Sequence, residues 1–175
     1  MPRASTQIDE LPIPVTSPTP PAGFAELYEL HYEAVFRAAL RVTGNPADAE
    51  DVLQTVFLRV LARGGDVEDV AQPSAYFRRA AVNAAVDVLR RRELHAESVY
   101  DDRAPHAASQ TPSLLKERLR RALTAVDGED ASLFLLRHVE GLSIEELAGM
   151  FQMERNNVAV RLHRIRRRLQ AEMER

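Results

Sequence analysis

Apolar residues recur every three or four positions along most of this chain, and no segment alternates apolar and polar residues as a half-buried strand does. This period is typical of amphipathic helices, so the sequence predicts an all-α protein. The expected helices cover residues 24–42, 46–61, 74–93, 113–125, 130–140, 143–151 and 156–173.

Residues with known capping preferences separate these runs. The segment Gly44-Asn45-Pro46 ends the first run, and it places Asn45 as a cap and Pro46 in the first position of the next helix. Ser74 and Ser113 are placed to open the third and fourth helices. These residues mark where the helices are expected to begin and end.

Composition divides the chain into a tail, two domains and a linker. Residues 1–23 hold six of the ten prolines and few large apolar side chains, which predicts a disordered tail. Residues 98–112 are small or polar and read as a flexible linker between helical domains at 24–97 and 113–175. The predicted fold is two small helical domains, each only marginally able to bury a core.

Several classes of function are excluded by what the sequence lacks. Without cysteine there is no disulfide framework, no thiolate nucleophile and no cysteine-ligated zinc. The five histidines have no metal-binding spacing, and there is no glycine-rich phosphate loop or serine elbow. We therefore expect no enzyme activity, no metal and no cofactor. No apolar run approaches the roughly 18 residues of a membrane span, so we expect a cytoplasmic chain without membrane insertion.

Charge is unevenly distributed along the chain. The net charge is −3, but residues 24–70 carry −5, while 150–175 hold seven arginines against three glutamates. Of the 23 basic residues, 22 are arginine, whose planar fork suits phosphates and guanine edges. A GC-rich genome would produce the same bias, so the positions of the arginines matter more than their number.

The C-terminal segment has the layout of a helix-turn-helix. Ser143 with Glu146 forms a capping box before a short helix, and Gln152-Met153 is the turn before a longer one. The outward residues near the start of that longer helix are Arg155, Asn156, Asn157, Val160, Arg161 and Arg164. Arginine and asparagine can read guanine and adenine, and the triplet 166–168 suits phosphates. The alternative is a surface helix with solvated arginines.

The third predicted helix has basic residues at both ends. Arg78 and Arg79 lie near its start, and the arginine triplet 90–92 lies near its end. A favourable interaction with the helix dipole also explains the triplet. Tyr76 and Phe77 stand beside these residues, as aromatics that hold unstacked bases do. The spacing places Phe77 in the core instead.

Taken together, these segments resemble the extracytoplasmic-function (ECF) sigma factors of the sigma-70 family. Residues 24–32, 49–59 and 81–92 are similar to region 2 of that family, and 135–148 and 161–169 are similar to region 4. The resemblance implies a bacterial transcription initiation factor without catalytic activity. It also implies three partners: core RNA polymerase through its β′ clamp helices and β flap, promoter DNA, and an anti-sigma factor of the kind that often holds such proteins.

The resemblance also implies which residues make each contact. The polymerase clamp would be bound by Asp51, Val52, Gln54, Leu58 and Arg59. The −10 element would be bound by Tyr76, Arg79, Asn83, Arg90 and Arg91. The −35 element would be bound by Arg155, Asn156, Asn157, Val160, Arg161, His163, Arg164 and Arg167.

At five positions the sequence departs from the family pattern. Thr55 stands where glutamate is usual, Tyr76 replaces tryptophan, and Gln152 occupies the turn glycine. Glu154 takes the place of a capping serine, and Ala159 that of a lysine or arginine aimed at DNA. The hypothesis that follows is that part of the −35 specificity rests on the first turn of the last helix.

Two other classes of protein fit parts of the sequence. One is a helix-turn-helix repressor or activator that binds duplex DNA without polymerase, although the alternating strands of a response-regulator receiver are absent. The other is a helical adaptor, which leaves the arginine-rich last helix unexplained. Affinity for core polymerase separates all three classes.

Overall fold

The computed structural model describes residues 23–63, 72–98 and 112–175, and within these ranges the chain forms seven helices and no strand. They are α1 (Phe24–Thr43), α2 (Pro46–Ala62), α3 (Pro73–Ser98), α4 (Pro112–Ala125), α5 (Gly128–His138), α6 (Ile144–Phe151) and α7 (Arg155–Met173). The predicted all-α fold is confirmed. The predicted tail (apart from Gly23) and most of the predicted linker lie outside the described residues.

The predicted start of α2 is confirmed in detail. The side-chain oxygen of Asn45 accepts the backbone N–H groups of Ala47 at 2.9 Å and Asp48 at 3.3 Å, and Pro46 is in the first turn. Such a cap satisfies donors that the helix itself cannot. The sequence alone was sufficient here because every partner lies within three residues.

Other helix ends differ from the prediction. Helix α3 begins at Pro73, so Ser74 lies inside its first turn, and it continues to Ser98 rather than ending near residue 93. No proline or glycine interrupts this stretch, and α4 likewise begins at a proline, Pro112. Proline is favoured in the first turn because its missing N–H costs nothing there.

Helix α5 starts two residues before its predicted position. The side chain of Asp127 accepts the backbone N–H of Glu129 at 2.9 Å and so caps the helix, which then ends at His138. Asp127 lies between the expected helices 113–125 and 130–140, and its role as a cap was not predicted.

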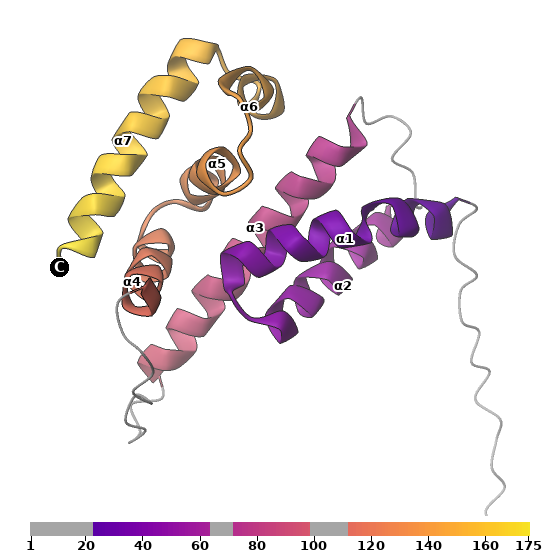
Figure 1. Ribbon diagram of the computed structural model, residues 1–175, viewed down its shortest axis with the longest axis horizontal. Coiled ribbons are helices and arrows are strands. Elements are labelled where there is room, and N and C mark those ends of the chain that lie inside the picture. The colour runs from indigo at the N-terminus through magenta and orange to yellow at the C-terminus, as the bar shows by residue number, and fades with distance from the viewer. Residues whose placement is uncertain (1–22, 64–71, 99–111) are drawn as a thin grey trace, which may run out of the picture.

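The helices form two bundles, α1–α3 and α4–α7 (Figure 1). In the first, Phe77 is fully buried as predicted, with its ring stacked 4.4 Å from that of His31 and 5.4 Å from that of Phe57. In the second, α7 turns an apolar stripe toward α4, α5 and α6. The buried members of this stripe are Val158, Leu162, Ile165 and Leu169.

The two bundles touch along what we call the seam, where α3 packs mainly against α4 and α5 (Figure 1). Polar contacts of α1 with α4 and with Glu140, and of α3 with α6, also belong to the seam. Arg41 pairs with Glu140 across it at 2.7 Å, and the Nε of Arg120 donates to the carbonyl of Val42 at 3.3 Å. Gly44, at φ +68°, leaves room for this arginine, since a Cβ there would meet its Nη2 at 1.9 Å. The seam therefore combines a charged pair with close packing of the Arg120 side chain against Gly44.

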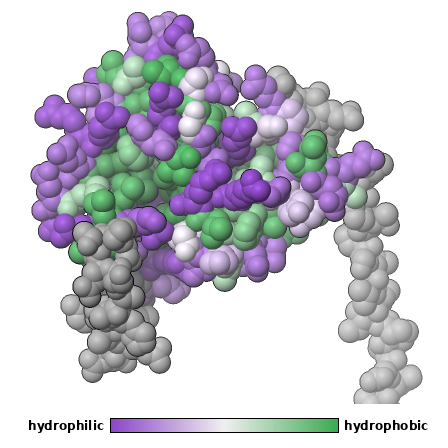
Figure 2. All heavy atoms as spheres, in the orientation of Figure 1, coloured by the Kyte–Doolittle hydropathy of each residue, from purple (hydrophilic) through white to green (hydrophobic). Residues whose placement is uncertain are grey.

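The surface shows no continuous apolar face on the side drawn in Figure 2, where apolar patches over both bundles are broken by polar residues. Among the described helices, none has the length and apolar character needed to cross a bilayer.

The buried His31 makes the stability of the first bundle sensitive to pH. Burial lowers the pKa of His31 below its ordinary value of 6.5, so the folded chain holds this ring neutral. Below pH 6.5 the unfolded chain gains a proton that the folded chain resists, and stability therefore falls as pH drops from 7.5 to 5.5. Urea unfolding across this range is expected to show a smaller fall for His31→Phe. An equal fall in both proteins would contradict this assignment.

Candidate nucleic-acid interface

Helices α6 and α7 form the predicted helix-turn-helix, and its capping box is present. The hydroxyl of Ser143 accepts the N–H of Glu146 at 3.1 Å, and the carboxylate of Glu146 accepts the N–H of Ser143 at 2.7 Å. The backbone and hydroxyl of Ser143 lower the pKa of Glu146. The first helix is thus fixed at its start by local contacts.

The turn between the two helices accommodates two of the departures named above, Gln152 and Glu154. Gln152 has φ +53°, the left-handed conformation, and among the described residues no other non-glycine residue has positive φ. It therefore adopts the backbone geometry for which glycine would be favoured. Glu154, at the cap position of α7, makes no side-chain cap hydrogen bond. Both departures leave the turn intact, at some expected cost in stability.

Substitutions at the N-caps of α6 and α7 are expected to change the free energy of unfolding in opposite directions. Glu154→Ser supplies a missing acceptor and is expected to raise the free energy of unfolding by about 0.5–1 kcal/mol, while Ser143→Ala removes one and should lower it by about 1 kcal/mol. Urea unfolding of the full chain, followed by circular dichroism, measures both. Changes in the same direction would show that N-cap hydrogen bonds do not determine the stability of the helix-turn-helix.

Most of the predicted −35 residues lie on the exposed side of α7. Arg155 pairs with Glu145 of α6, whereas Asn157, Arg164 and Arg167 make no hydrogen bond or ion pair with any described side chain. The exposed members are Arg155, Asn156, Asn157, Val160, His163, Arg164 and Arg167. Donors left free in this way can bind base edges or phosphates.

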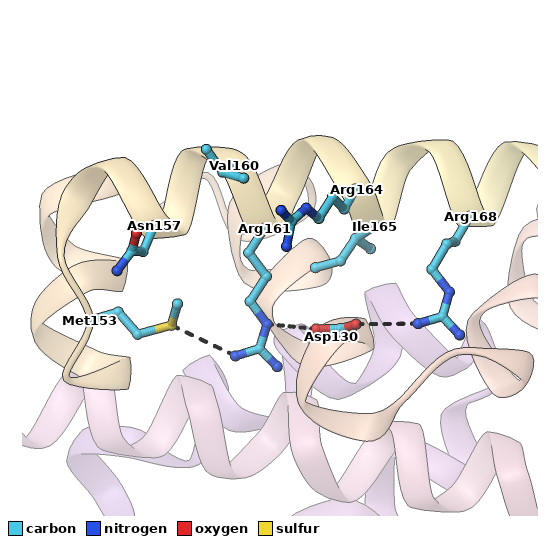
Figure 3. Close-up of a pocket in the computed structure, with 8 residues that line it drawn as sticks. All are labelled: Asp130, Met153, Asn157, Val160, Arg161, Arg164, Ile165 and Arg168. Carbon is cyan, nitrogen blue, oxygen red and sulfur yellow. Dashed lines mark hydrogen bonds and ion pairs between the residues drawn. The ribbon is translucent and has the colours of Figure 1, made fainter.

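Arg161 is the exception among the predicted −35 residues, because its side chain is only 28% exposed. Figure 3 shows it turned toward Asp130 of α5, whose Oδ1 accepts from its Nε at 2.7 Å. Its Nη2 donates to Glu129 at 2.7 Å. Burial lowers the pKa of Arg161, but the two carboxylates outweigh it, and the pKa is raised overall. The prediction that Arg161 faces outward is therefore wrong.

The predicted −10 residues lie at or beside the seam. Arg79 donates to the backbone carbonyl of Met150, and its guanidinium stands 4.3 Å from the ring centre of Phe151. Asn83 lines a pocket of about 390 Å³ together with these two side chains from opposite bundles, Arg79 and Phe151. Tyr76 is partly buried, and its hydroxyl accepts from Arg63 at 3.1 Å.

The arginines at the far end of α3 divide into two kinds. Arg90 donates to the carbonyl of Val126 at 2.5 Å and so also belongs to the seam, whereas Arg91 is exposed. The third member of the triplet, Arg92, pairs with the buried Asp48 at 2.7 Å. Two of the three arginines therefore hold protein groups in this arrangement.

The predicted polymerase-binding residues lie on α2, and for one of them, Val52, the prediction of a surface contact is wrong. Asp51, Gln54, Leu58 and Arg59 are exposed, and Leu58 is 62% exposed despite its apolar side chain. Val52 is fully buried in the core and cannot touch a partner. Val52, Val56 and Val60 recur at steps of four residues, and all three lie on the buried side of α2.

Sequence reasoning missed the groups that meet these residues across the seam and beneath α7. Met150, Phe151, Glu129 and Asp130 lie 31 or more positions from their arginine partners. The short-range patterns of the sequence carried no signal for them. No cluster of acidic or histidine side chains that could hold a metal occurs among the described residues.

A capped helix-turn-helix with an arginine- and asparagine-bearing second helix, joined to a three-helix bundle, places the chain in the helix-turn-helix class. Comparison with known families narrows this class. The family description Sigma-70 region 2 matches residues 27–94, and Sigma-70, region 4 matches residues 116–169.

Two curated relatives and one solved structure agree with these matches. The chain is 32% identical over 154 residues to RNA polymerase sigma-E factor of Streptomyces avermitilis, covering 86% of this chain and 85% of the relative. It is 33% identical over 156 residues to ECF RNA polymerase sigma factor SigE of Mycolicibacterium smegmatis, covering 82% and 59%. The sigma factor RpoE, in its complex with the anti-sigma factor NepR from Bartonella quintana, has a similar fold at TM-score 0.51 and 20% identity, covering 86% and 96%. The chain belongs to the sigma-70 family, among its ECF sigma factors.

Proposed function

We propose that this chain binds bacterial core RNA polymerase in the cytoplasm and directs it to promoters, without catalysing a reaction itself. The observation that carries the proposal is the order of two parts in one chain, a region 2 bundle followed by a region 4 helix-turn-helix. A helix-turn-helix alone would fit a repressor equally well. The additional bundle, with an exposed acidic and apolar strip on α2, gives polymerase a surface to bind.

Within this proposal the described residues have separate roles. The clamp would be bound by Asp51, Gln54, Leu58 and Arg59, with Val52 supporting them from the core. The −10 element would be bound by Tyr76, Arg79, Asn83, Arg90 and Arg91, and the −35 element by the exposed residues of α7. An anti-sigma factor is proposed as a third partner, because the similarly folded RpoE was solved in complex with one, NepR.

Run-off transcription with core polymerase on fragmented genomic DNA tests the proposal. We expect discrete start sites that need this chain and share two upstream elements. A known sigma factor, assayed in parallel, controls for the quality of the core enzyme. If that control works and no new starts appear, the chain does not initiate transcription, and duplex binding by the free chain would then favour a repressor.

Promoter binding should separate the two bundles, because Arg79 and Arg90 are partly buried against carbonyls of the second bundle, which covers them from DNA. The chain lacks cysteine and tryptophan, so a bimane label on Gly149→Cys and a quencher at Gln72→Trp can be placed without background. Both positions line one pocket at the seam. Fluorescence should be quenched in the free chain and rise with core polymerase and promoter. The labelled chain without the tryptophan sets the unquenched level, and unchanged quenching in the promoter complex would contradict separation.

A further inference from the structure

Arg161 occupies the middle of the DNA-facing stripe of α7, but it points toward protein. Asn157, Arg161, Arg164 and Arg168 follow one another at steps of four, three and four residues, which places them on one side of the helix. All four line a single open pocket with Asp130 (Figure 3).

Asp130 lies in the first turn of α5 and faces two turns of α7. One carboxylate oxygen is 2.7 Å from Nε of Arg161, and the other is 3.9 Å from Nη1 of Arg168. The Asp130 side chain is only 15% exposed, and that of Arg161 is 28% exposed. A charged hydrogen bond shielded in this way is stronger and more directional than a surface ion pair.

Arg161 also reaches the turn of the helix-turn-helix. Its Nη1 lies 3.7 Å from the sulfur of Met153, and its Nη2 bonds Glu129. One side chain thus joins the start of α5, the turn and the recognition helix α7. The apolar stripe of α7 sets which face of the helix packs inward, and this directional bond adds a second restraint on rotation about the helix axis.

We infer that Asp130 and Arg161 are positioning residues, which set the rotation of α7 so that Asn157 and Arg164 face the DNA bases. This inference rests on the proposed binding of the −35 element by α7. It assigns to Arg161 a role different from base reading. The inference also explains why a carboxylate lies beside a DNA-binding surface. The bond to Asp130 keeps Arg161 from binding DNA phosphates of any sequence.

The variants Asp130→Asn and Arg161→Gln, and the double variant, test this inference as full chains in polymerase holoenzyme. The measurement is binding to the promoter against the same DNA with a scrambled −35 element, at several salt concentrations. Each single variant should lose about tenfold in discrimination, the value of one good base contact. Asp130→Asn alone should also bind scrambled DNA more tightly with a steeper salt dependence, by about one phosphate contact, because it frees Arg161. The double variant should discriminate between the promoter and the scrambled DNA no worse than either single variant, because both substitutions remove the same bond.

Glu129→Gln is the matched control, since it removes a carboxylate bonded to the same arginine from a position that is 50% exposed. It should change discrimination by less than about twofold. A merely destabilising change would weaken binding to both DNAs and would not steepen the salt dependence. If Arg161→Gln loses discrimination at one base pair while Asp130→Asn does not, or if the two losses multiply, Arg161 reads DNA and the inference is wrong.

A second measurement without DNA separates this inference from the proposed function. In the free chain, the Nε–H proton of Arg161 should exchange slowly by NMR, and this protection should be lost in Asp130→Asn. Rapid exchange in the wild type would overturn the inference. Failure of the wild-type holoenzyme to find a promoter would instead count against the proposed function, and the protection of Arg161 would still test the bond on which positioning depends.

Discussion

Alanine substitution of both Asn157 and Arg164 is expected to lower transcription from this chain's promoter about 100-fold. Both side chains are exposed and make no hydrogen bond or ion pair with a described residue, so their donors and acceptors remain for DNA. A bidentate base contact provides about 1–3 kcal/mol of discrimination, and two such contacts multiply in the binding constant. Run-off transcription at fixed salt measures the loss.

Arg175→Ala is the control for this double variant. It removes one positive charge, as Arg164→Ala does, but from a residue beyond the C-terminal end of α7. Its side chain is 78% exposed and pairs only with Glu172 among the described residues. It should change transcription by less than about twofold. Full activity of the double variant would mean that the −35 element is read elsewhere. A large effect of Arg175→Ala would point to general attraction by charge.

Phe77→Ala is expected to lower the free energy of unfolding by about 3–5 kcal/mol, the usual cost of removing a fully buried aromatic side chain. The loss is large because the ring contacts both His31 of α1 and Phe57 of α2 and so joins the three helices of the first bundle. A bundle of this size has little stability to spare. Urea unfolding of the full chain measures the change.

Leu94→Ala on the same helix is the matched control. Leu94 is 65% exposed, so its removal should change the free energy of unfolding by no more than about 0.5 kcal/mol. Alanine is at least as good a helix former as the residue it replaces at both positions, so similar losses for the two variants would contradict the packing role assigned to Phe77. In that case the stacked rings would not be the centre of this core.

The features predicted correctly from the sequence are those whose partners lie close along the chain. The caps at Asn45 and Ser143 bond within three residues, and the burial of Phe77 follows from the helical period of α3. The cap at Asp127 was missed because a neighbouring glycine also fits a turn. Local chemistry therefore defines most of the helices but not every end.

The candidate site was less predictable because a guanidinium can bind DNA or a distant protein group. Arg79, Arg90 and Arg161 were all assigned to DNA, and each holds a protein group from a distant part of the chain in this arrangement. The acceptors are backbone carbonyls and carboxylates far along the chain. No spacing rule in a single sequence indicates them.

The seam has a consequence for the order of events at a promoter. Polar contacts across it occupy Arg79 and Arg90 of the proposed −10 surface, while Asn157 and Arg164 of the proposed −35 surface stay exposed. If the closed form were favoured by about 100 to 1, the free chain would bind −10 DNA about a hundredfold more weakly than an open chain, with no such loss at −35 DNA. Duplex recognition would thus come first, and the strand-separated element would be engaged only after the bundles part.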